Sequence, residues 1–254
     1  MRYLVVKKKS LMLAAAALAV LAAVAALTVQ SNAAAVYLGV NPRKVPIYRV
    51  DTTEKKVAIS FDAAWGADRT QSLLDTIKEY DVSATFFLVG FWARKYPEYV
   101  QKINDAGLEI GTHSNTHPHM PRLSEAQMEL ELKESCASIE AVTKKKTELF
   151  RAPFGDYSDK MLNVCGRLGL KTIQWDVDSL DWKDLSSQTM TERVLSRVKP
   201  GSVILFHNDG KFTPDALPAI LLGLKNKGFT VTSVGDLLLK GEYTIDHAGE
   251  MKAK

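Results

Sequence analysis

Short apolar segments alternate with longer amphipathic segments between residues 57 and 240, and this alternation restricts the fold more than any other feature. The apolar segments are predicted as strands, at residues 57–61, 84–89, 108–112, 148–151, 171–175, 203–206 and 229–232. Apolar residues at helical spacing predict helices between and after them, at residues 68–80, 92–106, 124–142, 158–168, 189–198, 214–227 and 234–240. Strands buried on both faces between helices imply a parallel sheet with the helices outside.

Polar residues stand where these strands end, and they decide between an open sheet and a barrel. They are Asp62, His113, Arg151, Asp176, Asp178 and His207. In a barrel the carboxyl ends of the strands share one rim, where active sites form, whereas an open sheet would spread them along an edge. The sequence therefore predicts an α/β fold, an irregular TIM-like (β/α)7 barrel.

The charge of the chain argues against a nucleic-acid partner. The formal net charge of its 254 residues is +4, but Arg2, Lys7, Lys8 and Lys9 supply four of the 33 positive charges, against 29 acidic residues. The rest of the chain is therefore neutral, while nucleic-acid binding depends on neutralising phosphates. Without a leader, about 200 residues remain, which suits one domain with a sizeable core.

Residues 1–35 are predicted to form a basic cytoplasmic stub followed by a transmembrane anchor. Residues 10–28 carry no charge, and this uncharged stretch has about the minimum length for a membrane span. The preceding lysines place the rest of the chain outside the cytoplasm, so a single-pass membrane protein is expected. The small residues 33–35 offer a cleavage site, so secretion after cleavage near Ala35 remains an alternative.

The remaining domain limits follow from composition. Residues 36–55 are predicted to be a linker, residues 56–240 the functional domain, and residues 241–254 a polar, loose tail. Cys136 and Cys165 lie in consecutive predicted helices without a CxxC pattern. Two unpaired thiols are favoured, although an exported protein could form a bridge.

Two histidines four residues apart, His113 and His117, follow a predicted buried strand. Imidazoles at this spacing can converge on one divalent metal, most simply zinc, which would acidify a bound water and polarise a carbonyl. Asp62 could take the proton of that water, and Arg151 could hold Asp62 ionised. His207, with its pKa raised by a carboxylate such as Asp178, could protonate a leaving nitrogen. These parts describe metal-assisted hydrolysis of an amide or ester.

Five segments in order resemble the motifs of the polysaccharide deacetylases of carbohydrate esterase family 4, which share the NodB homology domain. They are residues 60–63 (Ser-Phe-Asp-Ala), 113–117 (His-Ser-Asn-Thr-His), 151–155 (Arg-Ala-Pro-Phe-Gly), 178–182 (Asp-Ser-Leu-Asp-Trp) and 205–207 (Leu-Phe-His). The resemblance covers residues 56–239. Residues 61–66 (Phe-Asp-Ala-Ala-Trp-Gly) are similar to the sporulation-linked, PdaB-type branch of spore-forming Gram-positive bacteria.

The resemblance implies a role for each matching residue. Asp62 would be the base, His207 the acid, and His113 and His117 the metal ligands. The resemblance also implies that Arg151 and Asp178 adjust the protonation of these groups. The backbone N–H of Phe154 would hold the oxyanion, and Trp182 and Leu205 would form the wall around the acetyl methyl group.

One position departs from the family pattern. Ala63 stands where the family usually has a second aspartate, which is a metal ligand, so a weaker metal site is expected. Water or Asp68 could occupy the third ligand position. The sequence does not show whether the His119 side chain points towards the metal.

The expected function is removal of N-acetyl groups from an amino-sugar polymer, first of all peptidoglycan, in the cell envelope and in connection with sporulation. Two alternatives remain. Ala63 favours a catalytically impaired glycan-binding or scaffold protein, and the same chemistry would also serve the deacetylation of a small molecule or of another acetylated carbohydrate.

Overall fold

The computed structural model describes residues 8–29 and 43–254, and the chain divides into two compact units, Met1–Arg43 and Lys44–Lys254. In the first unit, residues Lys8–Val29 form helix α1. Within the described part of the chain, no helix combines the length and apolarity needed to cross a bilayer. Arg2, Lys7, the predicted cleavage site at residues 33–35 and most of the linker lie outside the described residues.

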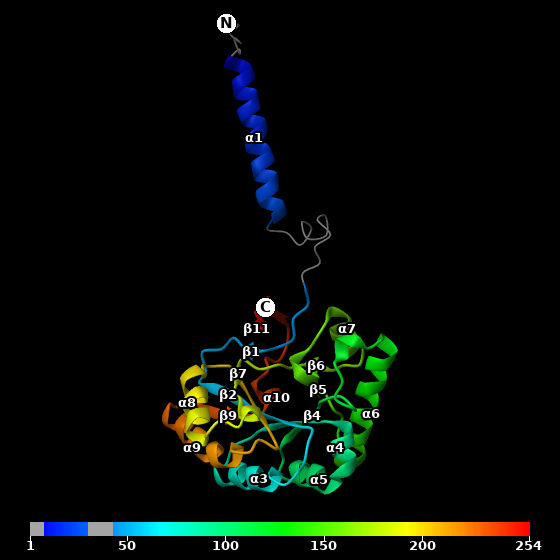
Figure 1. Ribbon diagram of the computed structural model, residues 1–254. Helices are drawn as coiled ribbons and strands as arrows, with labels where there is room; N and C mark the ends of the chain where they lie inside the picture. Colours follow the sequence, from blue (N-terminus) through cyan, green and yellow to red (C-terminus); the bar gives the residue numbers. More distant parts are fainter. Residues whose placement is uncertain (1–7, 30–42) are drawn as a thin grey trace. The chain divides into compact units, whose positions relative to one another are not determined.

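The second unit is built around a curled parallel sheet with helices outside (Figure 1). Its strands are β2 (Lys56–Ala63), β3 (Thr85–Leu88), β4 (Glu109–Thr112), β5 (Leu149–Phe150), β6 (Lys171–Thr172), β7 (Val177–Asp178), β8 (Val203–His207) and β9 (Thr230–Thr232). The strand order is β6-β5-β4-β3-β2-β8-β7, and β9 also pairs with β2. All these pairs are parallel, so the predicted irregular barrel of strands and helices is confirmed.

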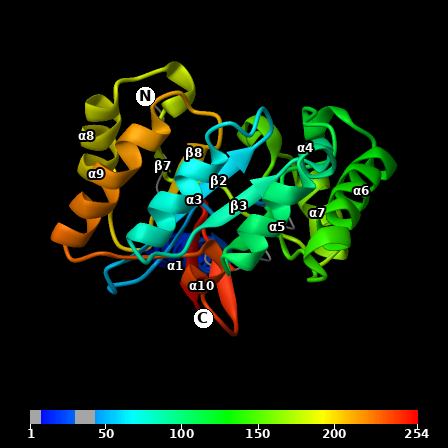
Figure 2. The same cartoon turned by 90° about the horizontal axis from the view of Figure 1, so that it is seen from below.

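The helices are arranged around the outside of the strands (Figure 2). They are α3 (Thr70–Glu79), α4 (Gly90–Lys95), α5 (Pro97–Asp105), α6 (Glu125–Thr143), α7 (Asp159–Arg167), α8 (Ser187–Arg197), α9 (Thr213–Asn226) and α10 (Val234–Leu237). The single helix predicted over 92–106 is two helices. Pro97 disfavours helical geometry at Tyr96 and starts α5 as a first-turn proline.

The predicted strand at 171–175 also differs, because the structure divides this region into β6 and β7. The chain leaves the sheet after Thr172, and Ile173 bridges to Ile47 in the segment that precedes β1 (Arg49–Val50). β7 then pairs with β8 at the other end of the strand order. The two ends of the curled sheet are therefore consecutive in the chain.

An aromatic row on the helix-facing side of the sheet supports its central strands. Phe61 of β2 is the register partner of Phe86 on β3 and of Phe206 on β8. The ring centroids are 4.8 and 5.5 Å from that of Phe61, in stacked geometry. Because side chains alternate along a strand, Ser60 and Asp62 of β2 face the other way, into the barrel. Burial of the phenylalanines thus directs Asp62 towards the site.

The C-terminal residues, predicted to be a loose polar tail, are an ordered hairpin instead. Strands β10 (Tyr243–Ile245) and β11 (Glu250–Ala253) pair antiparallel, and β1 (Arg49–Val50) adds in parallel to β11. Met251 is fully buried, and Arg49 forms an ion pair with Glu250 at 2.8 Å. Few apolar residues occur in this stretch, so its order depends on pairing with β1, which the local sequence does not reveal.

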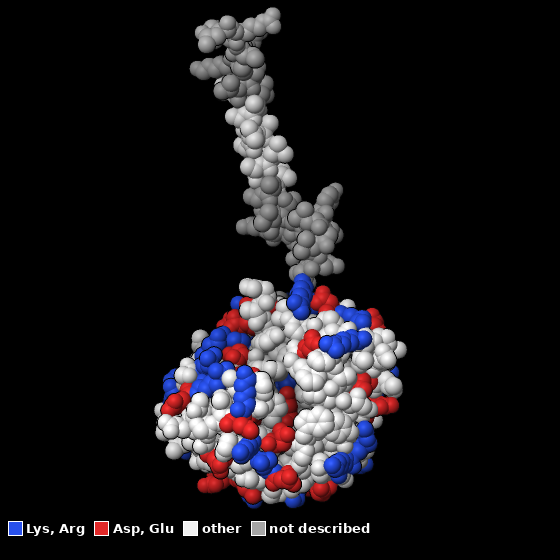
Figure 3. Space-filling view, viewed as in Figure 1, with Lys and Arg blue, Asp and Glu red and all other residues white. Residues whose placement is uncertain are grey.

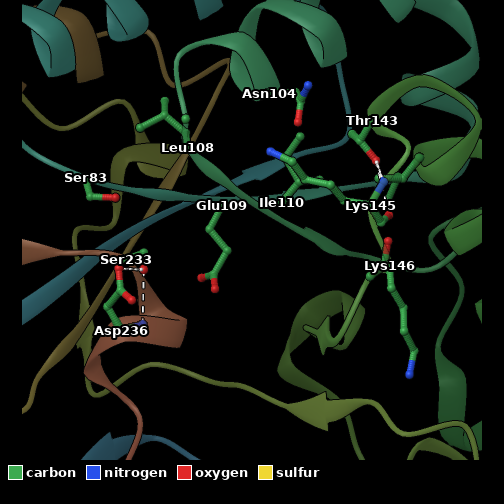
Figure 4. A pocket seen from close by; sticks show the side chains of 13 residues that line it. Ser83, Asn104, Leu108, Glu109, Ile110, Thr143, Lys145, Lys146, Ser233 and Asp236 are labelled. Carbon is green, nitrogen blue, oxygen red and sulfur yellow. Dashed lines mark hydrogen bonds between the residues drawn. The ribbon is translucent and has the colours of Figure 1, made fainter.

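A small cavity of about 280 Å³ lies at the amino end of β4 (Figure 4). The Glu109 carboxylate accepts hydrogen bonds from the Thr85 hydroxyl at 2.6 Å and from the Gly235 N–H at 2.9 Å. Burial raises the pKa of Glu109. These hydrogen bonds connect β4 to β3 and to α10, so Glu109 has a structural role at this end of the barrel.

Candidate active site

A cleft of about 610 Å³ lies at the carboxyl ends of the strands, within the range of ~300–1,000 Å³ usual for ligand pockets. The predicted site residues that line it are Asp62, His113, His117, Phe154, Asp178, Trp182, Leu205 and His207. On the face of the second unit that Figure 3 shows, Lys and Arg side chains are interspersed with Asp and Glu side chains.

Asp62 and His207 are direct neighbours in the sheet. They are register partners on the parallel strands β2 and β8, and both line the cleft. Residues 145 positions apart in the sequence therefore meet because β8 inserts beside β2. A carboxylate and an imidazole placed side by side provide the two groups that a paired base and acid require.

Arg151 lies beneath the cleft and holds Asp62. It is fully buried, and its Nη1 donates to Asp62 Oδ1 at 2.8 Å, while Nη2 donates to Ser60 Oγ at 2.8 Å and to the Gln174 carbonyl at 3.2 Å. Its guanidinium also stacks on the Phe87 ring at 4.2 Å. The arginine is thus held in one orientation against the carboxylate.

The charge balance keeps Asp62 ionised. Burial by itself would raise the pKa of the Asp62 carboxyl, but the Arg151 charge, helped by His113 and His207, holds that pKa below its usual value. Burial lowers the pKa of Arg151, which is opposed by Asp62 and, more weakly, by Asp178. Asp62 is therefore ionised at neutral pH, the state that a base requires.

The two predicted ligand histidines converge. His113 Nδ1 lies 2.8 Å from the Arg151 carbonyl oxygen, which can only accept, so Nδ1 carries the hydrogen and Nε2 is left with a lone pair. His113 Nε2 lies 3.5 Å from Asp62 Oδ2, and the His117 ring centroid is 5.0 Å from that of His113. Burial lowers the pKa of both imidazoles, that of His117 to about 4. Both are neutral at pH 7, as metal ligands must be.

The donor set therefore suits a divalent metal in part. His113 and His117 present two neutral imidazoles on one side of the cleft, but the described residues contain no group of three His, Cys, Asp or Glu side chains arranged to hold a metal. Ala63 is buried and carries no donor, and Asp68 is exposed on the following loop. His119 bonds Asp156 at 3.1 Å and stacks on Phe154.

The partner of His207 is Asp181, and the prediction of Asp178 in this role was wrong. Asp181 Oδ1 lies 2.7 Å from His207 Nδ1, and Oδ2 accepts from the His207 backbone N–H at 2.6 Å. Asp178 Oδ1 instead accepts from the Leu180 N–H at 2.8 Å. That bond closes a local turn with Leu180 in the left-handed region, which directs the second aspartate of the motif to the histidine.

Asp181 changes the protonation of His207. Burial alone would lower the pKa of the imidazole, but the hydrogen bond and charge of Asp181, together with the charge of Asp62, raise it to about 9. Asp181 is itself fully buried and accepts a further hydrogen bond from the Thr213 hydroxyl at 2.9 Å. His207 is therefore protonated at neutral pH and can donate from Nε2.

The residues expected at the wall of the cleft differ in exposure. Leu205 is buried beneath the cleft, whereas Trp182 is 57% and Phe154 60% exposed. Phe154 has a left-handed φ of 61° between Pro153 and Gly155, a conformation that is strained for a side chain of this size. Its ring and that of His117 meet in edge geometry, with 4.6 Å between centroids, so the strained turn places an aromatic ring beside His117.

A glutamate that the sequence does not reveal holds the loop between His113 and His117. Glu131 of α6 accepts from the backbone N–H groups of Asn115 and Thr116, both at 2.8 Å, and from the Thr116 hydroxyl at 2.7 Å. The loop includes left-handed residues at Ser114 and His117, which such bonds help to maintain. On its helix Glu131 resembles any surface glutamate, so only the tertiary contact identifies it.

The polysaccharide deacetylase family model matches residues 49–173. The chain is 31% identical over 193 residues to the Bacillus subtilis protein YlxY, covering 76% of this chain and 60% of YlxY. It is also 31% identical to the B. subtilis peptidoglycan-N-acetylmuramic acid deacetylase PdaC, over 74% of this chain and 40% of PdaC. The chain thus spans about half the length of these curated relatives.

Among solved structures, a mutant of BA3943 superposes with a TM-score of 0.74 at 35% identity, covering 76% of this chain and 71% of that one. The wild-type protein, from Bacillus anthracis, is described as a pseudoenzyme of the CE4 family, and the mutant as having restored enzymatic activity. The five motifs, the fold and these similarities agree. The chain belongs to the polysaccharide deacetylase family, carbohydrate esterase family 4.

Proposed function

We propose that this protein is a metal-dependent hydrolase that removes N-acetyl groups from the amino sugars of peptidoglycan. The observation that carries the proposal is the cleft itself, where an ionised Asp62 and a protonated His207 lie side by side, next to two neutral imidazoles. The deacetylase activity of PdaC towards peptidoglycan supports the choice of substrate.

Each residue has a defined task in this proposal. A divalent metal, most simply zinc, bound by His113 and His117 would supply a Lewis acid for the acetyl carbonyl and for water. Asp62 accepts the proton of the attacking water, and Arg151 keeps Asp62 ionised and oriented. Expulsion of the sugar amine requires a proton, which His207 donates.

The walls of the cleft complete the proposal. The Phe154 backbone N–H is proposed to stabilise the oxyanion, with Leu205 and Trp182 forming the wall around the acetyl methyl group.

Because peptidoglycan lies outside the cytoplasmic membrane, the proposal includes an extracytoplasmic location. The PdaB-like stretch at residues 61–66 extends it to the envelope of sporulating cells.

The direct test is acetate release by the purified protein. We expect release from peptidoglycan fragments and from N-acetylglucosamine oligomers in the presence of added zinc or cobalt, and its loss on chelation. Absence of acetate from every amino-sugar substrate with either metal would exclude the enzymatic proposal.

A second function is favoured by Ala63, which removes the usual third metal ligand. A protein of this family that binds metal poorly could serve as a glycan-binding scaffold, and BA3943 is described as a pseudoenzyme of the same family. Titration calorimetry separates the two functions. Zinc binding to His113 and His117 supports the enzyme, and absence of binding at millimolar zinc supports the scaffold.

Replacing Ala63 with Asp is expected to tighten zinc binding at least tenfold, because a charged oxygen donor is added directly after Asp62 at the end of β2. The measurement is zinc titration by calorimetry. Ala63→Asn is the matched control, since it has the same size without the charge and should gain much less. Equal zinc affinities of Ala63→Asp and the wild type would show that position 63 does not reach the metal.

Activity is expected to fall at alkaline pH. Since the raised pKa of His207 is about 9, the acid is protonated throughout the neutral range, and kcat/KM should decline about tenfold per pH unit above ~9. Asp181→Asn removes the negative charge that raises the His207 pKa, and burial then lowers that pKa. The alkaline decline in kcat/KM should therefore begin at least one pH unit lower. A pH–rate profile checks this, and an unchanged alkaline limb in Asp181→Asn would contradict the assignment.

A further inference from the structure

Three exposed aromatic side chains surround the cleft. Among the described residues of the second unit, the large hydrophobic side chains with high exposure are Trp65, Leu130, Phe154, Trp182, Leu222 and Ile245. All three aromatic members of this set line the cleft, and none of the aliphatic members does. Exposed apolar surface gathered at one cleft marks a place where a ligand covers it.

Trp65 belongs to this set, and nothing in the proposed mechanism requires it. Trp65 is 58% exposed, although Ala64 before it and Ala67 two residues after it are buried. The indole lies 5.3 Å from the Phe91 ring and 5.9 Å from the His117 ring, measured between centroids. A large apolar ring at the surface exposes apolar area whose burial would stabilise the fold.

The loop that carries Trp65 is held firmly. The Gly66 carbonyl, next in the chain, accepts from Trp92 Nε1 at 2.6 Å and from Asn208 Nδ2 at 3.0 Å. Gly66 has a left-handed φ of 55°, which a glycine adopts without strain. The backbone beside the indole is therefore anchored, and the Phe91 and His117 rings pack next to the indole itself. A binding surface that is largely preformed loses less entropy when a ligand binds.

The position of Trp65 relative to the reacting groups suggests what it binds. Trp65 contacts His117 and Phe91, which follow β4 and β3, whereas Trp182 follows β7. In the strand order β4-β3-β2-β8-β7, the strands of Asp62 and His207 lie between these two sides. The two indoles thus flank the reacting centre, and a ligand that touches both must extend beyond a single sugar ring.

We propose that Trp65 is a stacking platform for the sugar ring next to the N-acetylhexosamine that reacts, so that the substrate is a glycan chain. This inference depends on the proposed function for the identity of the reacting sugar. One face of a pyranose ring presents C–H groups, which pack on an aromatic face, while the hydroxyl groups stay in water. Trp65 determines specificity in this proposal and takes no part in the chemical step.

The test compares N-acetylglucosamine oligomers of increasing length. In Trp65→Ala we expect KM for the tetramer and the dimer to rise about tenfold, KM for the N-acetylglucosamine monomer, which lacks the neighbouring ring, to change less than threefold, and kcat to be retained. Trp65→Phe should recover most of the tetramer affinity, because it keeps an aromatic face. Leu222→Ala, an exposed residue outside the cleft, is the control and should match the wild type.

Each outcome decides the proposal. An equal rise in KM for monomer and tetramer, or a loss confined to kcat, would show that Trp65 only supports His117 and would overturn the stacking role. If the wild type releases no acetate, the proposed activity fails, and calorimetry with the tetramer still tests the platform. Tetramer binding that weakens about tenfold in Trp65→Ala but not in Leu222→Ala then supports it, and equal binding by all three proteins, or none by the wild type, overturns it.

Discussion

Replacing Asp62 with Asn is expected to lower acetate release by about 10²- to 10⁴-fold, the contribution usual for a positioned base. Asn keeps the size of the side chain but cannot accept the proton of water. His207 stays in place, because its orientation depends on Asp181. The measurement is acetate release with saturating metal, and zinc affinity is measured in parallel to separate loss of the base from loss of metal.

The control for this variant is Asp51→Asn, which removes an exposed carboxylate from the surface. It should retain full activity. Because Asp62→Asn also leaves Arg151 buried without a counter-charge, its folding should be checked by circular dichroism at the assay temperature. A folded Asp62→Asn protein that retains more than a tenth of the wild-type rate would rule out Asp62 as the base.

Replacing Arg151 with Leu should produce the largest loss of stability, about 3–5 kcal/mol in the free energy of unfolding. The guanidinium is fully buried and makes three hydrogen bonds, and its loss leaves the Asp62 carboxylate, which is 4% exposed, without its directly hydrogen-bonded cation. Urea unfolding measures the change. The pKa of Asp62 should rise as well, because the charge that lowers it is gone.

Two comparisons test the reason for this loss. Arg167→Leu removes an arginine of an exposed ion pair with Glu125, with an N–O distance of 2.8 Å, and should cost at most about 1 kcal/mol. The double variant Asp62→Leu/Arg151→Leu should be more stable than Arg151→Leu alone, since no unpaired charge is then buried. A double variant less stable than Arg151→Leu would show that packing around the arginine, and not charge compensation, dominates.

The prediction from sequence is most accurate where it depends on periodicity. The strand–helix alternation locates most of the elements, and the polar residues after the strands include Asp62, His113, Arg151 and His207. Strand ends are local features, and parallel pairing brings them to one edge whatever the details of the loops. The motifs then identify the family, which the comparisons bear out.

Prediction fails where the hydrogen-bond partner of a residue depends on the geometry of a turn or on the packing of a distant helix. The sequence offers two aspartates three residues apart, and only the left-handed turn at Leu180 places Asp181, and not Asp178, on His207. The C-terminal hairpin has the same origin, since its order comes from β1, about 200 residues earlier.

The sequence by itself therefore determined the fold class, the end of the barrel that carries the site, and the ionisable groups that converge there. The tertiary structure decided which carboxylate raises the pKa of His207, which glutamate holds the loop between His113 and His117, and which exposed indoles line the cleft. The physical reason is that hydrophobic period and strand ends are encoded within a few residues. Hydrogen-bond partners such as Glu131 depend instead on how α6 packs against a loop formed elsewhere in the chain.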